Sequence, residues 1–278
     1  MPDPVAKGSS GRQRTVVKKL STSKPRGSLP IAPQGGALRG LKTSESVARD
    51  IVHDIVTAGL QDGDGLPSEA AMLQQYGVSR ESLREGLRLL EVQGLIRIRR
   101  GPGGGPIVGS LDPANMGRTS TLYFHLAGAT YAELFDAWVI SEGTIVELAA
   151  RNPDREAIRA AMAPYLEDDE HAHDDENLAE FVTKHTQFHL AIGNLARNKV
   201  LQLTLMAIGE IIVHHVVMNS DPRDARITIE HDHRAIAQAL SAGHAKKAVG
   251  LMHDHIRNVT DFYRGDLGPQ MDDFIDWR

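Results

Sequence analysis

The chain has 278 residues, which is enough for one large or two ordinary domains. Its residues are 41% hydrophobic and 24% charged, as is typical of a globular protein. It contains no cysteine, which excludes a disulfide framework and a thiolate metal site. The net charge is −5, no apolar run is long enough for a transmembrane helix, and no secretory signal follows the basic N-terminus. We therefore expect a soluble cytoplasmic protein without a membrane partner.

Residues 1–42 differ from the rest of the chain in composition. They are rich in Gly, Ser and Pro, carry nine Lys or Arg against the single acid Asp3, and show no hydrophobic period. This composition predicts a disordered basic tail. The tail is either a solvated extension or an arm that follows the DNA backbone, because a basic segment on an acidic body favours an anionic partner.

Residues 43–110 have the element order of a winged helix-turn-helix. The stretch SESVARDIVHDIVTAGL has apolar residues at helical spacing, and Gly and Pro interrupt the chain after it. Ser68 is expected to cap a short second helix that ends at Gly77, and Ser79 to cap a third. The stretch IRIRRGPGGGPIVG then predicts a hairpin with a Gly/Pro tip.

The start of the third helix carries the side chains that a recognition helix needs. Short polar and basic residues at the N-terminal end of such a helix meet the base edges in the major groove. Leu83, Leu87, Leu90 and Val92 are instead predicted to face a small core. The wing supplies basic residues for the DNA backbone and a glycine for close approach. The candidate DNA-binding residues are Ser68, Ser79, Arg80, Glu81, Ser82, Arg84, Arg99, Arg100 and Gly101.

Residues 66–101, LPSEAAMLQQYGVSRESLREGLRLLEVQGLIRIRRG, resemble the winged helix-turn-helix of the GntR family of transcription regulators. The family pattern LPSE, then GVSR, then VREALRRLEAEGLV is present in order. One departure is Ala70, which stands where family members often carry an Arg that touches DNA. The resemblance implies a regulator, and two half-sites supply more contact than one small module, so we expect a homodimer on a palindromic operator.

Residues 111–264 are predicted to form an antiparallel all-helical bundle, which makes the protein mainly α. Six helical segments follow a first helix that begins at Asp112-Pro113, and the interruptions between them are short. Residues 265–278 are expected to form a C-terminal tail.

Eleven of the 13 histidines lie between residues 171 and 255. His185 and His189 share one helical face, whereas His233 and His255 belong to two later helices. Three helices could thus point four imidazoles at one centre, which would suit Zn²⁺ or Ni²⁺. From spacing alone, ordinary core or surface histidines remain the favoured alternative.

Residues 112–262 are similar to the FCD ligand-binding domain of the FadR branch of this family. The resemblance implies a divalent metal ion, zinc or nickel, held by His189, His233 and His255, with His185 at a position where the family carries Asp. It also implies a small organic acid as effector. Trp138 stands where an Arg is usual, which favours a larger and more apolar effector. Asn194 is expected to line the pocket or to cap its helix locally.

These features together predict an effector-controlled DNA-binding regulator, expected to be a repressor and not an enzyme. One alternative is a metal-free regulator that responds to an acyl chain or acyl-CoA. Another is a metal-dependent hydrolase, but the stretch HTQFH lacks the Glu of the HExxH motif, so no obvious general base accompanies the histidines.

Overall fold

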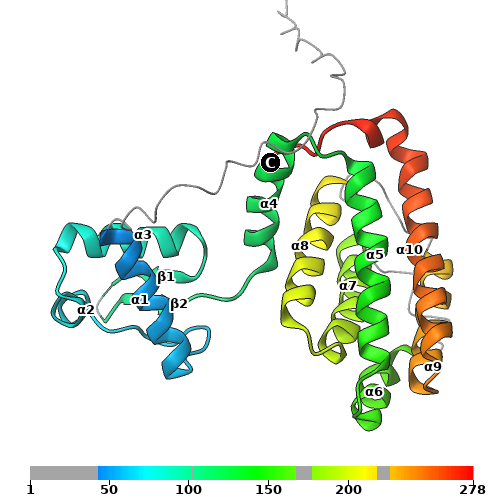
Figure 1. Cartoon of the computed structure of the whole chain (residues 1–278), viewed down its shortest axis with the longest axis horizontal. Helices are drawn as coiled ribbons and strands as arrows, with labels where there is room; N and C mark the ends of the chain where they lie inside the picture. The colour runs from blue at the N-terminus through cyan, green and yellow to red at the C-terminus, as the bar shows by residue number, and fades with distance from the viewer. Residues whose placement is uncertain (1–42, 102, 167–176, 218–225, 278) are drawn as a thin grey trace, which may run out of the picture.

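The N-terminal part of the computed structural model is a three-helix module with a small wing (Figure 1). Residues 43–101, 103–166, 177–217 and 226–277 are described, so the predicted tail at 1–42 lies outside them. The module comprises α1 (Thr43–Ala58), α2 (Glu69–Tyr76), α3 (Arg80–Val92), β1 (Ile96–Arg99) and β2 (Gly105–Val108). The two strands are antiparallel and pair Ile96 with Val108.

Local sequence signals explain the helix boundaries in this module. The side chain of Ser68 accepts a hydrogen bond from the amide of Ala71, and that of Ser79 accepts one from the amide of Ser82. These bonds satisfy amides that lack a partner within the helix, as predicted. Gly77 ends α2 in the left-handed conformation with φ 62°.

The core of the module is formed by apolar side chains from all three helices and β1. Leu83, Leu87 and Leu90 are buried, as predicted, and Val92 is 77% exposed. The prediction for Val92 was wrong because this residue lies two positions after Leu90, which turns it to the opposite side of the helix.

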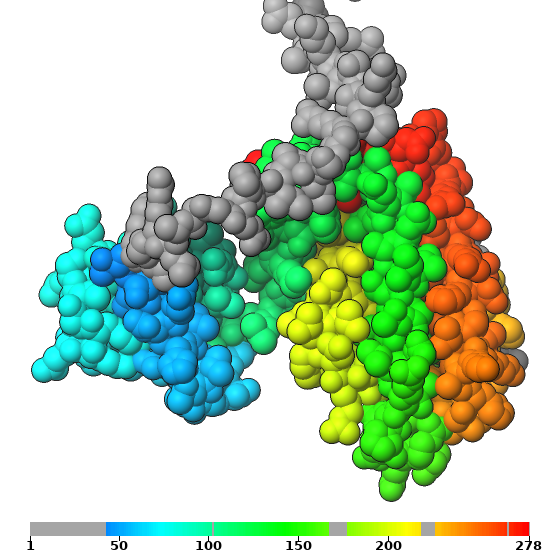
Figure 2. All heavy atoms as spheres, viewed as in Figure 1, coloured from blue at the N-terminus to red at the C-terminus, as the bar shows by residue number. Residues whose placement is uncertain are grey.

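The C-terminal part is an all-helical bundle, so the predicted fold class is confirmed. It contains α4 (Pro113–Ala127), α5 (Tyr131–Ala150), α6 (Arg155–Met162), α7 (Leu178–Leu195), α8 (Lys199–His215), α9 (Arg226–Ser241) and α10 (Ala245–Leu267). Helix α5 packs against α7, α8 and α10, and α4 packs against α8. Figure 2 shows α8, α5 and α10 side by side on one face of the bundle. No helix among the described residues is long and apolar enough to span a membrane.

The last residues, expected to form a separate tail, pack against the bundle. Helix α10 continues to Leu267, and a 3₁₀ turn, Gly268–Asp272, follows it. The amide of Ile275 then donates to the carbonyl of Ala129 at 2.9 Å, and the amide of Tyr131 donates to the carbonyl of Asp273 at 3.2 Å. Ile275 is only 1% exposed. This segment therefore connects the end of α10 to the turn between α4 and α5.

Candidate metal centre and DNA-binding surface

The predicted DNA-binding residues lie at the start of α2, at the start of α3 and on the wing. Arg80 and Glu81 are exposed in the first turn of α3, with Ser82 half-buried beside them. Arg84 is also exposed, and its Nε lies 3.2 Å from Glu69 Oε2. Arg80 has no hydrogen bond or ion pair with any described residue, which leaves its guanidinium available for a base edge.

The wing presents further basic groups to solvent. Arg99 and Arg100 are exposed, and Arg99 Nη2 donates to the carbonyl of Gly103 at 3.4 Å. Gly101 has φ 96°, a left-handed conformation that L-residues with a side chain rarely adopt. Ser68 is exposed at the start of α2, where its hydroxyl serves as a helix cap. The surface thus combines exposed cations with the N-terminus of α3, both of which attract phosphates.

The four predicted histidines meet at one place in the bundle. His185 and His189 come from α7, His233 from α9 and His255 from α10. Each ring offers one nitrogen to the cluster, and these four nitrogens all lie within 4.8 Å of one another. His233 and His255 are buried at 7% and 0% exposure. The packing of three helices therefore brings together residues that are up to 70 positions apart in sequence.

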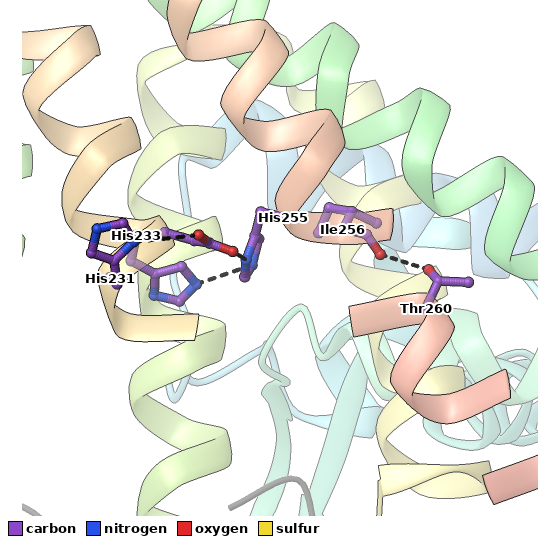
Figure 3. Close-up of polar contacts among 6 residues, drawn as sticks. His231, His233, His255, Ile256 and Thr260 are labelled. Atoms are coloured by element: carbon purple, nitrogen blue, oxygen red, sulfur yellow. Dashed lines mark hydrogen bonds and ion pairs between the residues drawn. The ribbon is translucent and has the colours of Figure 1, made fainter. Parts of the chain in front are cut away.

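The spacing of two ring nitrogens matches that of ligands on one ion. His233 Nε2 lies 3.2 Å from His255 Nε2 (Figure 3). Two nitrogens about 2.0–2.1 Å from a tetrahedral Zn²⁺ lie roughly 3.3 Å apart. His185 Nδ1 and His189 Nε2 are buried and have no hydrogen-bond partner. Such buried, unpaired donor or acceptor atoms cost free energy unless a ligand or water satisfies them.

Burial keeps three of the four imidazoles in the form that binds metals. Burial, reinforced by neighbouring imidazoles, lowers the pKa of His185 and of His233 well below 6.5. Burial also lowers the pKa of His255, although hydrogen bonding to Asp232 opposes this effect. A neutral imidazole has a free lone pair, so the cluster is suited to a borderline ion such as Zn²⁺ or Ni²⁺.

Two carboxylates that sequence reasoning missed lie against this cluster. Glu142 on α5 is buried, and its Oε1 lies 2.8 Å from His189 Nδ1, although the two are not aligned as a hydrogen bond. Asp232 on α9 has its Oδ2 3.3 Å from His255 Nδ1. The position of Asp232 beside His233 in DHRAI was the only sequence signal for it. Nothing distinguished Glu142 from other acids on helices.

A pocket adjoins the histidine cluster and shares His185 and His189 with it. Trp138 and Glu142 also line the pocket, and Trp138 Nε1 donates to Glu142 Oε1 at 3.3 Å. The remaining lining is mainly apolar and contains no Lys or Arg among the described residues; it includes Phe181, Leu190, Leu205, Met206, Ile212 and Val213.

Trp138 and Asn194, both predicted to contact an effector, lie in different environments. Trp138 is 6% exposed and lines the pocket. Asn194 is exposed, accepts a hydrogen bond from Gln202 Nε2 at 2.8 Å and is not part of the described lining. Its neighbour Gly193 lies on the pocket side instead. The hydrogen bond of Asn194 thus goes to Gln202 on α8 and does not cap α7, and effector contact by Asn194 stays a prediction.

Comparison with known proteins gives the family. The family model described as "Bacterial regulatory proteins, gntR family" matches residues 43–104, and the model "FCD domain" matches residues 133–258. The Glc operon transcriptional activator of Escherichia coli K12 is 27% identical over 77% of this chain and 86% of its own length. The Uxu operon transcriptional regulator of the same strain is 29% identical over 74% of this chain and 80% of its own length.

The remaining comparisons agree with this assignment. The NanR repressor of Salmonella newport is 25% identical over 79% of this chain and 84% of its own length. Among solved structures, a GntR protein of Streptococcus agalactiae shares the fold, with a TM-score of 0.60 and 21% identity over 79% of this chain and 99% of that one. The Glc, Uxu and NanR relatives are transcription regulators and not enzymes. This chain therefore belongs to the GntR family of DNA-binding transcription regulators and carries an FCD domain.

Proposed function

We propose that this regulator changes its operator affinity when a small-molecule effector binds beside a divalent metal ion in the helical domain. The observation that supports this proposal most directly is the pocket that shares His185 and His189 with the four-histidine cluster. A ligand in the pocket would lie next to the ion. Coupling between two such sites typically amounts to about 1–3 kcal/mol.

The donor set fits a metal ion, zinc or nickel, held by His185, His189, His233 and His255. Four neutral imidazoles leave an open position on a five- or six-coordinate ion, and the ion would supply a Lewis-acid site for a carboxylate there. That the chain belongs to the FadR branch of the family stays a prediction, which rests on the sequence resemblance of residues 112–262.

We further propose that the effector is an organic acid with an apolar body. No Lys or Arg lines the described part of the pocket, so within the described residues the proposed metal ion would be the cation that a carboxylate meets. Trp138 and the aliphatic lining favour hydrocarbon beyond that group. The same lining also supports a second candidate, a metal-free regulator that binds an acyl chain or acyl-CoA.

On the DNA side, we propose a homodimer that binds a palindromic operator through α3 and the wing. The predicted contacts are Ser68, Ser79, Arg80, Glu81, Ser82, Arg84, Arg99, Arg100 and Gly101. Helix α4 carries an exposed apolar stripe, Met116, Tyr123 and Leu126, at 44%, 68% and 61% exposure. A stripe of this kind supports association with a second copy. We propose repression relieved by effector, which a reporter gene under the operator would test.

The first experiment is elemental analysis of untagged protein. We expect one metal ion per chain in the wild type and a loss of metal in His189→Ala. His214→Ala is the matched control, because His214 is 64% exposed and lies outside the cluster; it should retain the wild-type metal content. A wild type without metal would refute the metal centre and leave the acyl-chain candidate. Equal metal content in all three proteins would place the ion elsewhere.

A further inference from the structure

The histidine cluster has a second layer of acidic groups on the sides away from its centre. A ring that binds a metal through one nitrogen carries a hydrogen on the other and usually donates it to a carboxylate or a carbonyl. Such a partner fixes both the tautomer and the orientation of the ring. The nitrogens that face carboxylates therefore indicate which nitrogens are left for the ion.

His255 shows this arrangement clearly. Its Nδ1 lies 3.3 Å from Asp232 Oδ2, and its Nε2 lies 3.2 Å from His233 Nε2 (Figure 3). The second oxygen of Asp232, Oδ1, lies 3.7 Å from Nδ1 of the exposed His231. Asp232 thus takes the Nδ1 side of His255, and Nε2 of His255 is directed at the centre of the cluster.

His189 has an equivalent partner on a helix that supplies no histidine to the cluster. Its Nδ1 lies 2.8 Å from Glu142 Oε1 without being aligned as a hydrogen bond, and its Nε2 is buried with no hydrogen-bond partner among the described residues. The Glu142 side chain is 2% exposed, and Trp138 Nε1 donates to the same oxygen at 3.3 Å. The indole thus holds the carboxylate beside the Nδ1 side of the His189 ring.

The charge balance of the cluster supports the same role for the two carboxylates. Four neutral imidazoles around a divalent cation would leave two positive charges in a buried site, which costs free energy unless opposite charges lie close by. Asp232 and Glu142 provide two negative charges in direct contact with ligand rings. They compensate for the carboxylate that the family resemblance places at position 185, where this chain has His185.

We propose that Asp232 and Glu142 are positioning residues of the metal centre. Each holds the Nδ1–H of a histidine, directs Nε2 of His255 or His189 at the ion, and contributes one of the two charges that neutralise it. This inference rests on the proposed metal site. It places each carboxylate behind the ring of a ligand histidine, so neither carboxylate binds the ion directly.

The test compares zinc affinity in full-length, untagged Asp232→Asn, Glu142→Gln and the double variant. Affinity is measured by competition with a chromophoric zinc chelator. Loss of a carboxylate behind a metal-binding histidine typically weakens metal affinity about 10–100-fold, so we expect this loss for each single variant and a larger one for the double variant. Asp254→Asn is the matched control: Asp254 precedes His255 but its side chain is 74% exposed, and zinc affinity should stay within about twofold of wild type.

The visible spectrum of the Co²⁺-loaded proteins distinguishes a positioning role from direct ligation. Asp232→Asn and Glu142→Gln should keep the wild-type d–d bands, because the same imidazoles surround the ion, whereas His255→Ala should change them. Changed bands in Glu142→Gln would make Glu142 a ligand and overturn the assignment. Should Glu142→Gln fail to fold, the partly exposed Asp232 carries the test.

The outcomes also distinguish this inference from the proposal on which it rests. Wild-type protein that binds no zinc would refute the metal centre itself. Wild-type protein that binds zinc, together with unchanged affinity in Asp232→Asn and Glu142→Gln, would refute only the positioning role.

Discussion

Replacing Phe188 with alanine tests whether the core and the histidine cluster are one packed unit. Phe188 is fully buried, and its ring stacks on His233 with centroids 3.9 Å apart and planes 17° apart. Tyr165 meets the same ring edge-on at 5.0 Å. A buried aromatic side chain covers about 150–250 Å², which at about 25 cal/mol per Å² corresponds to roughly 4–6 kcal/mol. Phe→Ala substitutions in cores cost about 3–5 kcal/mol, so the two ranges overlap at about 4–5 kcal/mol.

Tryptophan fluorescence during urea unfolding of the chelator-treated protein measures the lost free energy of unfolding in the helical domain, which contains Phe188. The chain has two tryptophans, Trp138 and Trp277, and both lie in the helical part. With an m-value of about 2 kcal/mol/M, the midpoint of Phe188→Ala should fall by about 2 M urea. Leu83→Ala is the control, because Leu83 is equally buried but belongs to the DNA-binding module. A fall of less than about 1 kcal/mol, or an equal shift in Leu83→Ala, would refute the reasoning.

Three further changes have defined outcomes. Arg80→Ala should weaken operator binding by about 1–3 kcal/mol and relax sequence preference, as measured by selection from a random DNA library; an unchanged selected sequence would contradict a base contact. Burial lowers the folded-state pKa of His185, His233 and His255, so below about pH 6.5 the unfolded chain binds more protons. The metal-free protein should thus keep full stability above that pH and lose at most about 1.4 kcal/mol per pH unit per histidine below it, with the smallest share from His255, where Asp232 opposes the shift. Urea midpoints that match at pH 7.5 and 5.5 would contradict this. A Cβ on Gly86 would meet a valine side chain and a backbone carbonyl of α1 at 2.6 and 2.9 Å. Gly86→Ala should therefore lower DNA-module stability by about 1–3 kcal/mol despite a better helix propensity, which hydrogen exchange of residues 43–108 would detect.

Much of the fold was predictable because its signals are local. Ser68 and Ser79 precede apolar helical periods, and the structure confirms both as helix caps. The four histidines could be grouped because the three helices that carry them show clear apolar faces, which must share one core. Their function as metal ligands stays a prediction.

The remaining features depend on contacts between distant segments. Glu142 looks like any helical acid in sequence, and only the crossing of α5 with α7 turns it towards His189. The C-terminal segment has no hydrophobic period, and its bonds go to residues more than 140 positions earlier. Local patterns contain no information about such partners.

The bridge between Thr130 and Phe274 gives the chain a place for a reversible cross-link. The flanking bonds, Tyr131 to Asp273 and Ile275 to Ala129, make these two residues a non-hydrogen-bonded antiparallel pair. The Cα atoms of such a pair lie about 4.5 Å apart, within the range that a disulfide spans. Since the chain has no cysteine, a pair introduced here would have no native competitor, although the loss of the Thr130 cap would cost about 1 kcal/mol. Oxidation would then fasten the C-terminal segment to the start of α5, and a reductant would release it.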